Sequence, residues 1–155
     1  MRRNIIILAA ALGAANTLSG CQSSAIDALE TSSFAPASTD ISSADLAAGK
    51  AQFRDANYGL AEKHFRKAVE LRADNAEAWM GLAASYDQLG RFDFADRAYT
   101  QLLKVAGRQP RIVNNMGYSY LLRGDKTKAR SLLAEAQASL PGDPVVDANL
   151  ALLNG

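Results

Sequence analysis

A spacing of 34 residues recurs from Ser42 onward, and it constrains the fold more than any other feature of the sequence. Three sets of matching residues share this interval, one small, one alanine and one large and apolar: Gly49, Ala83 and Gly117; Ala61, Ala95 and Ala129; Phe65, Tyr99 and Leu133. Such a period is typical of solenoids, in which each repeat buries its apolar face only against its neighbours. The sequence therefore predicts three stacked units, over 42–75, 76–109 and 110–143.

Each unit is predicted to hold two helices joined by a short turn. The turn positions also recur at the same interval, as Ala56, Gly90 and Gly124, and each is followed by a polar residue. Glycine suits such a position because it ends helices in the left-handed conformation. We expect helices near 43–56, 59–72, 76–89, 92–105, 110–123 and 126–139.

Residues 144–155 follow the third unit and predict one more amphipathic helix. Val146, Leu150 and Leu153 fall at helical spacing, which favours a helix that caps the last repeat. A second apolar edge leaves open a docking role for the same helix, and it consists of Val145, Ala148 and Leu152.

Polar residues before several predicted helices are candidates for N-caps. Ser42 followed by Asp45 is similar to a capping box, in which the two residues satisfy each other's backbone N–H groups. Asp74 and Asn75 precede the third helix, and Asp143 precedes Pro144. Side chains of these types accept hydrogen bonds from the first turn of a helix.

The spacing and the residues resemble the tetratricopeptide repeat (TPR). The matching residues are Gly49, Ala61, Phe65 and Ala68 in the first copy, Trp79, Leu82, Tyr86 and Ala95 in the second, and Gly117, Tyr120, Ala129, Ala136 and Pro141 in the third. The resemblance implies an all-α fold, an α-solenoid of three TPR helix pairs plus a C-terminal capping helix. It also implies that the concave face of the solenoid binds a protein client.

The first twenty residues are typical of a secretory signal peptide. Arg2 and Arg3 precede an uncharged, mostly apolar run from Ile5 to Leu18. As a helix this run spans roughly 21 Å, which is short of the roughly 30 Å hydrocarbon core of a bilayer. We therefore predict a signal peptide over 1–20, with an uncleaved membrane anchor as the alternative.

Leu18-Ser19-Gly20-Cys21 resembles the lipobox of bacterial lipoproteins. The resemblance implies cleavage before Cys21, a diacylglyceryl group on its sulfur and acylation of the new amino terminus, for example with palmitate. Gln22 follows the cysteine, and the absence of Asp there implies an anchor in the outer membrane, facing the periplasm. Residues 21–41 are rich in Ser and Thr and contain no Lys or Arg, which predicts a flexible linker.

Composition gives little support to a catalytic, metal-binding or nucleic-acid-binding role. The formal net charge is only +1, and the chain has one cysteine and one histidine, His64. Neither a phosphate-binding glycine loop nor a nucleophile motif is present. We therefore predict a protein that is not an enzyme and that uses no cofactor or metal, with His64 as a surface residue. A pocket in which His64 lies beside carboxylates would favour the alternative that the protein is an enzyme.

The candidate binding site is the concave surface, which the first helix of each pair lines. We expect the partner-binding groove to include polar and apolar residues of three successive first helices: Lys50, Arg54, Met80, Asp87, Arg111, Asn114 and Tyr118. Apolar anchors with a few polar groups suit an extended or helical peptide.

Some TPR domains bind acidic C-terminal tails through a clamp of Lys, Arg and Asn side chains. Arg111 and Asn115 fit part of that pattern here, whereas Leu46 and Gly81 occupy other clamp positions. We therefore expect no recognition of an acidic C-terminal tail.

The lipidated start and the third copy, NNMGYSYLLRGDKTKARSLLAEA, are similar to the TadD family of TPR lipoproteins in tight-adherence (Flp) pilus systems. This resemblance implies a pilotin-like role in pilus assembly or secretion, in which the groove holds a secretin or a pilus assembly subunit. The alternative is an adaptor for peptidoglycan hydrolases or other envelope assembly machinery.

Overall fold

The computed structural model describes residues 40–154, and within this range every regular element is an α-helix. The helices are α1 (Ser43–Arg54), α2 (Tyr58–Leu71), α3 (Ala76–Gln88), α4 (Phe92–Ala106), α5 (Pro110–Leu122), α6 (Lys126–Ser139) and α7 (Pro144–Asn154). None of these described helices combines the length and the hydropathy that crossing a bilayer requires. The predicted signal peptide, Cys21 and nearly all of the linker lie outside the described residues.

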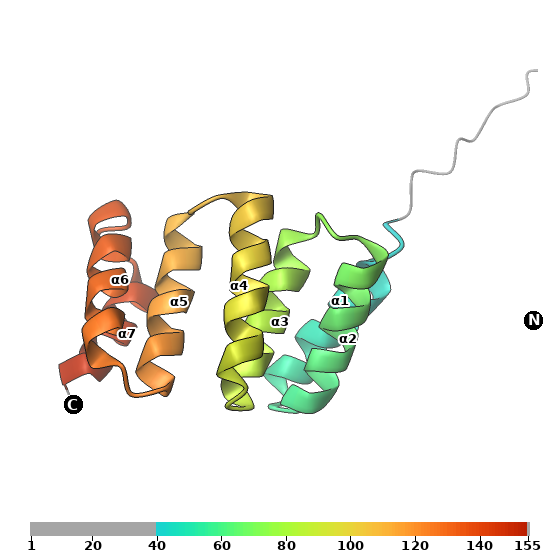
Figure 1. The fold of residues 1–155 in the computed structure, drawn as a ribbon, viewed down its shortest axis with the longest axis horizontal. Helices are drawn as coiled ribbons and strands as arrows, with labels where there is room; N and C mark the ends of the chain where they lie inside the picture. Colours follow the sequence, from blue (N-terminus) through green and yellow to red (C-terminus); the bar gives the residue numbers. More distant parts are fainter. Residues whose placement is uncertain (1–39, 155) are drawn as a thin grey trace, which may run out of the picture. The chain divides into compact units, whose positions relative to one another are not determined.

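Successive helices pack as three pairs, α1 with α2, α3 with α4 and α5 with α6 (Figure 1). Their ends agree with the predicted ranges to within two residues. The pairs then stack in chain order, with α2 on α3 and α4 on α5. The predicted all-α solenoid of three helix pairs plus a terminal helix is thus confirmed.

The two helices of a pair approach closely where a small residue faces a large one. A Cβ atom added to Gly49 would lie 2.8 Å from the ring of Phe65, and one added to Gly117 would lie 2.8 Å from the Leu133 side chain. Real Cβ contacts are longer than this, so the space at these two glycines is already filled. The recurring small and large positions of the sequence are therefore the contact points that hold each pair together.

Helix α7 closes the far end of the stack. Val146 and Leu153 are buried against residues of α5 and α6. Val145 and Leu152 lie on the other side of α7 and are 58% and 57% exposed. The helix thus has both apolar edges that the sequence predicted, and only one of them is covered by the described residues.

Turn and cap residues act mostly as predicted. Gly90 and Gly124 follow α3 and α5 with φ angles of +68° and +82°. The Asn75 side chain accepts a 3.0 Å hydrogen bond from the Ala78 N–H, and Asp143 Oδ1 accepts from the N–H groups of Val145 and Val146. These caps fix where α3 and α7 begin.

The predicted capping box at Ser42 is wrong. Ser42 precedes α1, but its side chain makes no cap hydrogen bond. Its Oγ donates to Asp40 and accepts from the Asn75 amide at 3.0 Å, so the hydroxyl joins the start of α1 to the start of α3. Asp45 is also occupied elsewhere, by His64 and Lys67 of α2. Contacts between helices have displaced the local cap.

Ala56 gives a direct test of the turn chemistry. It is the non-glycine residue with positive φ (+57°) among the described residues, and it stands one period before Gly90. A left-handed alanine costs about 1–2 kcal/mol, and a glycine at this position would remove that strain. The greater freedom of glycine in the unfolded chain offsets part of the gain in stability. We expect Ala56→Gly to raise the free energy of unfolding by about 0.5–1 kcal/mol in urea melts.

Gly90→Ala is the matched control. Its Cβ would meet no atom within 4 Å, so only the backbone conformation is changed. The free energy of unfolding of this variant should be lower than that of the wild type by about 1 kcal/mol. If the Ala56→Gly protein is no more stable than the wild type, the left-handed conformation at Ala56 is not a source of strain.

Candidate functional site

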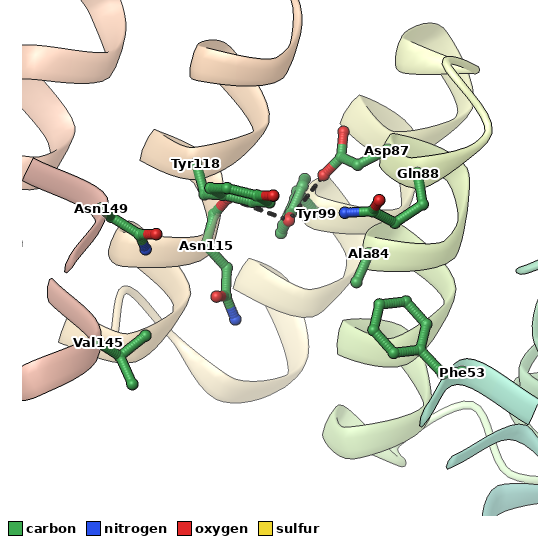
Figure 2. A pocket seen from close by; sticks show the side chains of 9 residues that line it. All are labelled: Phe53, Ala84, Asp87, Gln88, Tyr99, Asn115, Tyr118, Val145 and Asn149. Carbon is green, nitrogen blue, oxygen red and sulfur yellow. Dashed lines mark hydrogen bonds between the residues drawn. The ribbon is translucent and has the colours of Figure 1, made fainter. Parts of the chain in front are cut away.

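The first helices of the pairs and the terminal helix form one continuous surface. Helix α1 contacts α3, α3 contacts α5, and α5 contacts α7. A cavity of about 420 Å³ opens on this surface (Figure 2), and we call it the central groove. Its lining comes from α1, α3, α4, α5 and α7: Phe53, Ala84, Asp87, Gln88, Tyr99, Asn115, Tyr118, Val145 and Asn149.

Aromatic and amide side chains give the central groove its character. Phe53 comes from α1 and Tyr118 from α5, with the small Ala84 of α3 between them in the chain of helices. The side-chain amides of Gln88 and Asn115 point into the space between α3 and α5 (Figure 2). Such a surface offers apolar contact together with uncharged hydrogen-bonding groups.

A second cavity of about 310 Å³ adjoins the central groove between α1 and α3. The two share Phe53 and Ala84, so the groove continues toward the first repeat. The remaining lining residues are Lys50, Arg54, Phe65, Glu77, Met80 and Gly81. Lys50 Nζ lies 2.5 Å from Glu77 Oε1, so these two opposite charges neutralise each other across the two helices.

Two more hollows flank Arg111 at the start of α5. One of about 330 Å³ lies toward α3 and α4, and one of about 280 Å³ lies toward α7. Arg111 lines both, and it has no ion pair with any residue that the structure describes. Its guanidinium is therefore available to a ligand in the groove.

Asp87 joins the groove to the interior of the stack. It is only 4% exposed, and each carboxylate oxygen accepts a hydrogen bond. Ser119 Oγ donates to Oδ1 at 2.6 Å, and Tyr99 Oη donates to Oδ2 at 3.0 Å. Burial raises the pKa of the Asp87 carboxyl, and the two hydrogen bonds and the Arg123 charge oppose that rise.

Arg123 extends this network to the outer face. Its guanidinium donates to both carboxylate oxygens of Asp96 at 3.0 Å and to Ser119 Oγ at 2.7 Å. It also stacks on the rings of Phe92 and Tyr120, at 4.8 and 4.6 Å from their centroids. A bidentate pair with two aromatic contacts holds α4 against the end of α5.

All seven residues predicted for the partner-binding groove line one of these cavities. Lys50, Arg54 and Met80 line the cavity between α1 and α3. Asp87 and Tyr118 line the central groove, and Arg111 and Asn114 line the hollow beside α7. Whether they contact a client stays a prediction.

Two of the seven, Asp87 and Asn114, are buried and hydrogen-bonded inside the protein, whereas Lys50 pairs with Glu77 at the surface and Met80 accepts from Asn115. Asp87 is held as described above, and Asn114 is 4% exposed and accepts a 3.0 Å hydrogen bond from Asn149. Both shape the groove more than they offer free hydrogen-bonding groups to it.

Gln88, Val145 and Asn149 line the groove but were not among the predicted residues. The period could have found all three, because Gln88 stands 34 residues after Arg54, Val145 stands 34 after Arg111 and Asn149 stands 34 after Asn115.

His64 is half-buried and not simply a surface residue. Its Nδ1 lies 3.1 Å from Asp45 Oδ1, which also pairs with Lys67. Hydrogen bonds from His64 and Lys67 lower the pKa of the Asp45 carboxyl. Neither His64 nor Asp45 lines any of the cavities above. The pair joins α1 to α2 within the first repeat.

The repeated helix pairs and the groove along their first helices define an α-solenoid with a concave binding surface, the class to which TPR proteins belong. Residues 46–114 match the family model "Tetratricopeptide repeat". This segment is therefore similar to tetratricopeptide repeats, and the described helices outside it continue the same solenoid fold.

Known proteins are similar to this chain in part of the sequence or in the fold. The chain is 29% identical over 104 residues to the cytochrome c-type biogenesis protein CycH of Pseudomonas aeruginosa; the match covers 66% of this chain but only 26% of CycH. The solved structure of Pseudomonas aeruginosa pilF is 26% identical, with a TM-score of 0.62 over 72% of this chain and 51% of that one. The Yersinia enterocolitica chaperone SycD, solved with a peptide of the translocator YopD, is 21% identical and shares the fold, with a TM-score of 0.64 over 76% of this chain and 92% of that one.

The raised pKa of Asp87 predicts how its contribution to stability varies with pH. A carboxyl whose pKa is higher in the folded than in the unfolded protein stabilises the fold below its unfolded pKa. That contribution is lost as pH rises through the folded pKa. Asp87→Asn does not titrate, so the stability advantage of wild type over the variant should shrink as pH rises above about 4. Urea melts of both proteins from about pH 3.5, just below the ordinary Asp pKa, to about pH 7 measure this difference in the free energy of unfolding. An advantage that grows with pH would show that the charged form is the one the site favours.

Proposed function

We propose that this protein is a periplasmic TPR scaffold, anchored in the outer membrane through acyl chains on Cys21, that holds a protein client in its groove. One observation carries the binding part: the groove presents Arg54, Arg111, Gln88 and Tyr118, for which the described residues provide no side-chain hydrogen bond or ion pair. Aromatic and Arg side chains are the types that dominate binding energy at protein interfaces.

The anchoring part is supported by the sequence. A charged start, an apolar run and Leu18-Ser19-Gly20-Cys21 follow one another in the order of a lipoprotein signal. Two or three acyl chains hold a protein firmly on a bilayer surface. The linker up to residue 41 would then let the solenoid reach a client away from the lipid.

The client we favour is a secretin or another subunit of a tight-adherence pilus, which gives the protein a pilotin-like role. The support is the resemblance of the third repeat and of the lipidated start to TadD. In this proposal the groove binds the client, and the acyl chains bring the complex to the outer membrane.

A second candidate is an adaptor for other envelope assembly machinery, such as peptidoglycan hydrolases. The similarity to CycH, whose name assigns it to cytochrome c-type biogenesis, favours assembly clients other than pili. Both candidates use the same groove, and the identity of the co-isolated client separates them.

Co-isolation from solubilised membranes tests the groove. The variant combines Arg111→Glu with Tyr118→Ala, which reverses an unpaired charge and removes an aromatic contact. We expect the client bound by wild type to be lost, with the helical content unchanged by circular dichroism.

A matched control changes one arginine and one aromatic residue on the second helices. Arg130→Glu on α6 and Phe94→Ala on α4 affect exposed side chains outside the groove. This control should keep the client. Equal recovery of the client with both variants would remove the groove as the binding site.

The anchor has its own test. Cys21→Ser removes the sulfur that accepts the diacylglyceryl group. We expect the protein to leave the outer-membrane fraction and the amount of secretin multimer there to fall. Normal secretin multimers alongside a mislocalised variant would overturn the pilotin role but leave a scaffold for another client.

A further inference from the structure

The middle repeat leaves a recess in the groove because its groove-facing residues are small. Ala84 stands one period after Lys50 and one period before Tyr118, so the neighbouring repeats carry long side chains where α3 carries a methyl group. Gly81 lies one turn earlier on α3, and an added Cβ there would meet the ring of Phe65 at 2.4 Å. The floor of the recess therefore consists of small residues, and the buried ring of Phe65 packs directly behind it.

The walls of the recess are apolar. Phe53 and Ala84 line both the 420 Å³ and the 310 Å³ cavities, and Tyr118 of α5 completes the lining of the first and Met80 of α3 that of the second. Phe53 is itself held by an edge-to-face contact with Tyr58, whose ring centroid lies 5.2 Å away. A space of this size between two aromatic rings accommodates one large apolar side chain.

The uncompensated charge beside the recess is positive. Lys50 and Glu77 neutralise each other, and both oxygens of Asp87 accept hydrogen bonds from within the protein. Arg54 lines the cavity and forms no ion pair with any residue between 40 and 154. An acidic side chain on the ligand would supply the partner that Arg54 lacks.

The hydrogen-bonding groups of the groove suit an extended backbone. Gln88 has no side-chain hydrogen bond within the described residues, and Asn115 Nδ2 donates only to the sulfur of Met80, at 2.9 Å, which is a weak acceptor. An α-helix satisfies its own backbone groups, whereas an extended segment presents free N–H and C=O groups to such amides.

We propose that this recess takes one Leu or Phe side chain of an extended client segment that carries an acidic residue next to it, paired with Arg54. The proposal rests on the proposed function, in that the groove is the client site. It adds which side chain enters, where it enters and what charge accompanies it.

Fluorescence anisotropy with labelled peptides tests the recess. The probe is the nonapeptide Gly-Ser-Pro-Glu-Leu-Thr-Pro-Ser-Gly, in which the prolines prevent a helix. The full protein should bind this peptide at least about tenfold more tightly than the version with Ala in place of Leu. Equal affinities, or no binding of either peptide, would overturn the proposal. So would tighter binding of a helix-forming version with Ala in place of both prolines.

Protein variants locate the site. Ala84→Leu fills the recess and should reduce the affinity for the Leu peptide to that for the Ala peptide, whereas the control Ala134→Leu, at an exposed position of α6, should not. Arg54→Glu should reverse the charge preference, so that the peptide with Lys in place of Glu binds better. A peptide affinity unchanged by Ala84→Leu would place the anchor elsewhere and overturn the proposal.

Co-isolation of the client separates this proposal from the proposed function. If Ala84→Leu keeps the client while the Arg111→Glu, Tyr118→Ala variant loses it, the groove is the binding site but the recess is not the anchor. If neither variant loses the client, both proposals fail. Loss of the client in both variants, with retention by Ala134→Leu, supports both.

Discussion

The close approach of two helices at a small residue is the contact on which the rest of the structure depends. Gly49 against Phe65 and Gly117 against Leu133 fix the distance within the first and third pairs, and Ala83 with Tyr99 recurs at the same place in the second. Because each pair has the same internal geometry, the pairs stack with their first helices on one side. The groove is therefore a product of packing inside the pairs, and its lining residues are free to vary.

Most of the fold could be read from the sequence because the signals that set it are local or periodic. The 34-residue interval gave the helix pairs, and Asn75, Gly90, Gly124 and Asp143 marked helix ends that the structure confirms. The Ser42 cap failed for a physical reason. Its hydroxyl has a better partner in Asn75, which is 33 residues away and reaches it only once the repeats have stacked.

The site was predictable in outline and not in detail. Sequence position placed all seven predicted residues beside the groove, because the helical period decides which face a residue occupies. It could not show that Asp87 is enclosed by Ser119 and Tyr99, since these donors come from two other helices. Nor could it show that Ala84 leaves a recess, because the recess is defined by the side chains of the neighbouring repeats.

The open edge of α7 bears on how long the groove can be. This helix occupies the place of a first helix in a fourth pair, with Val146 and Leu153 turned to the stack and Leu152 turned away from it. By the 34-residue period Leu152 corresponds to Tyr118 and Val145 to Arg111, and Val145 itself lines the central groove. The exposed edge of α7 therefore lengthens the apolar lining of the groove by one helix beyond α5.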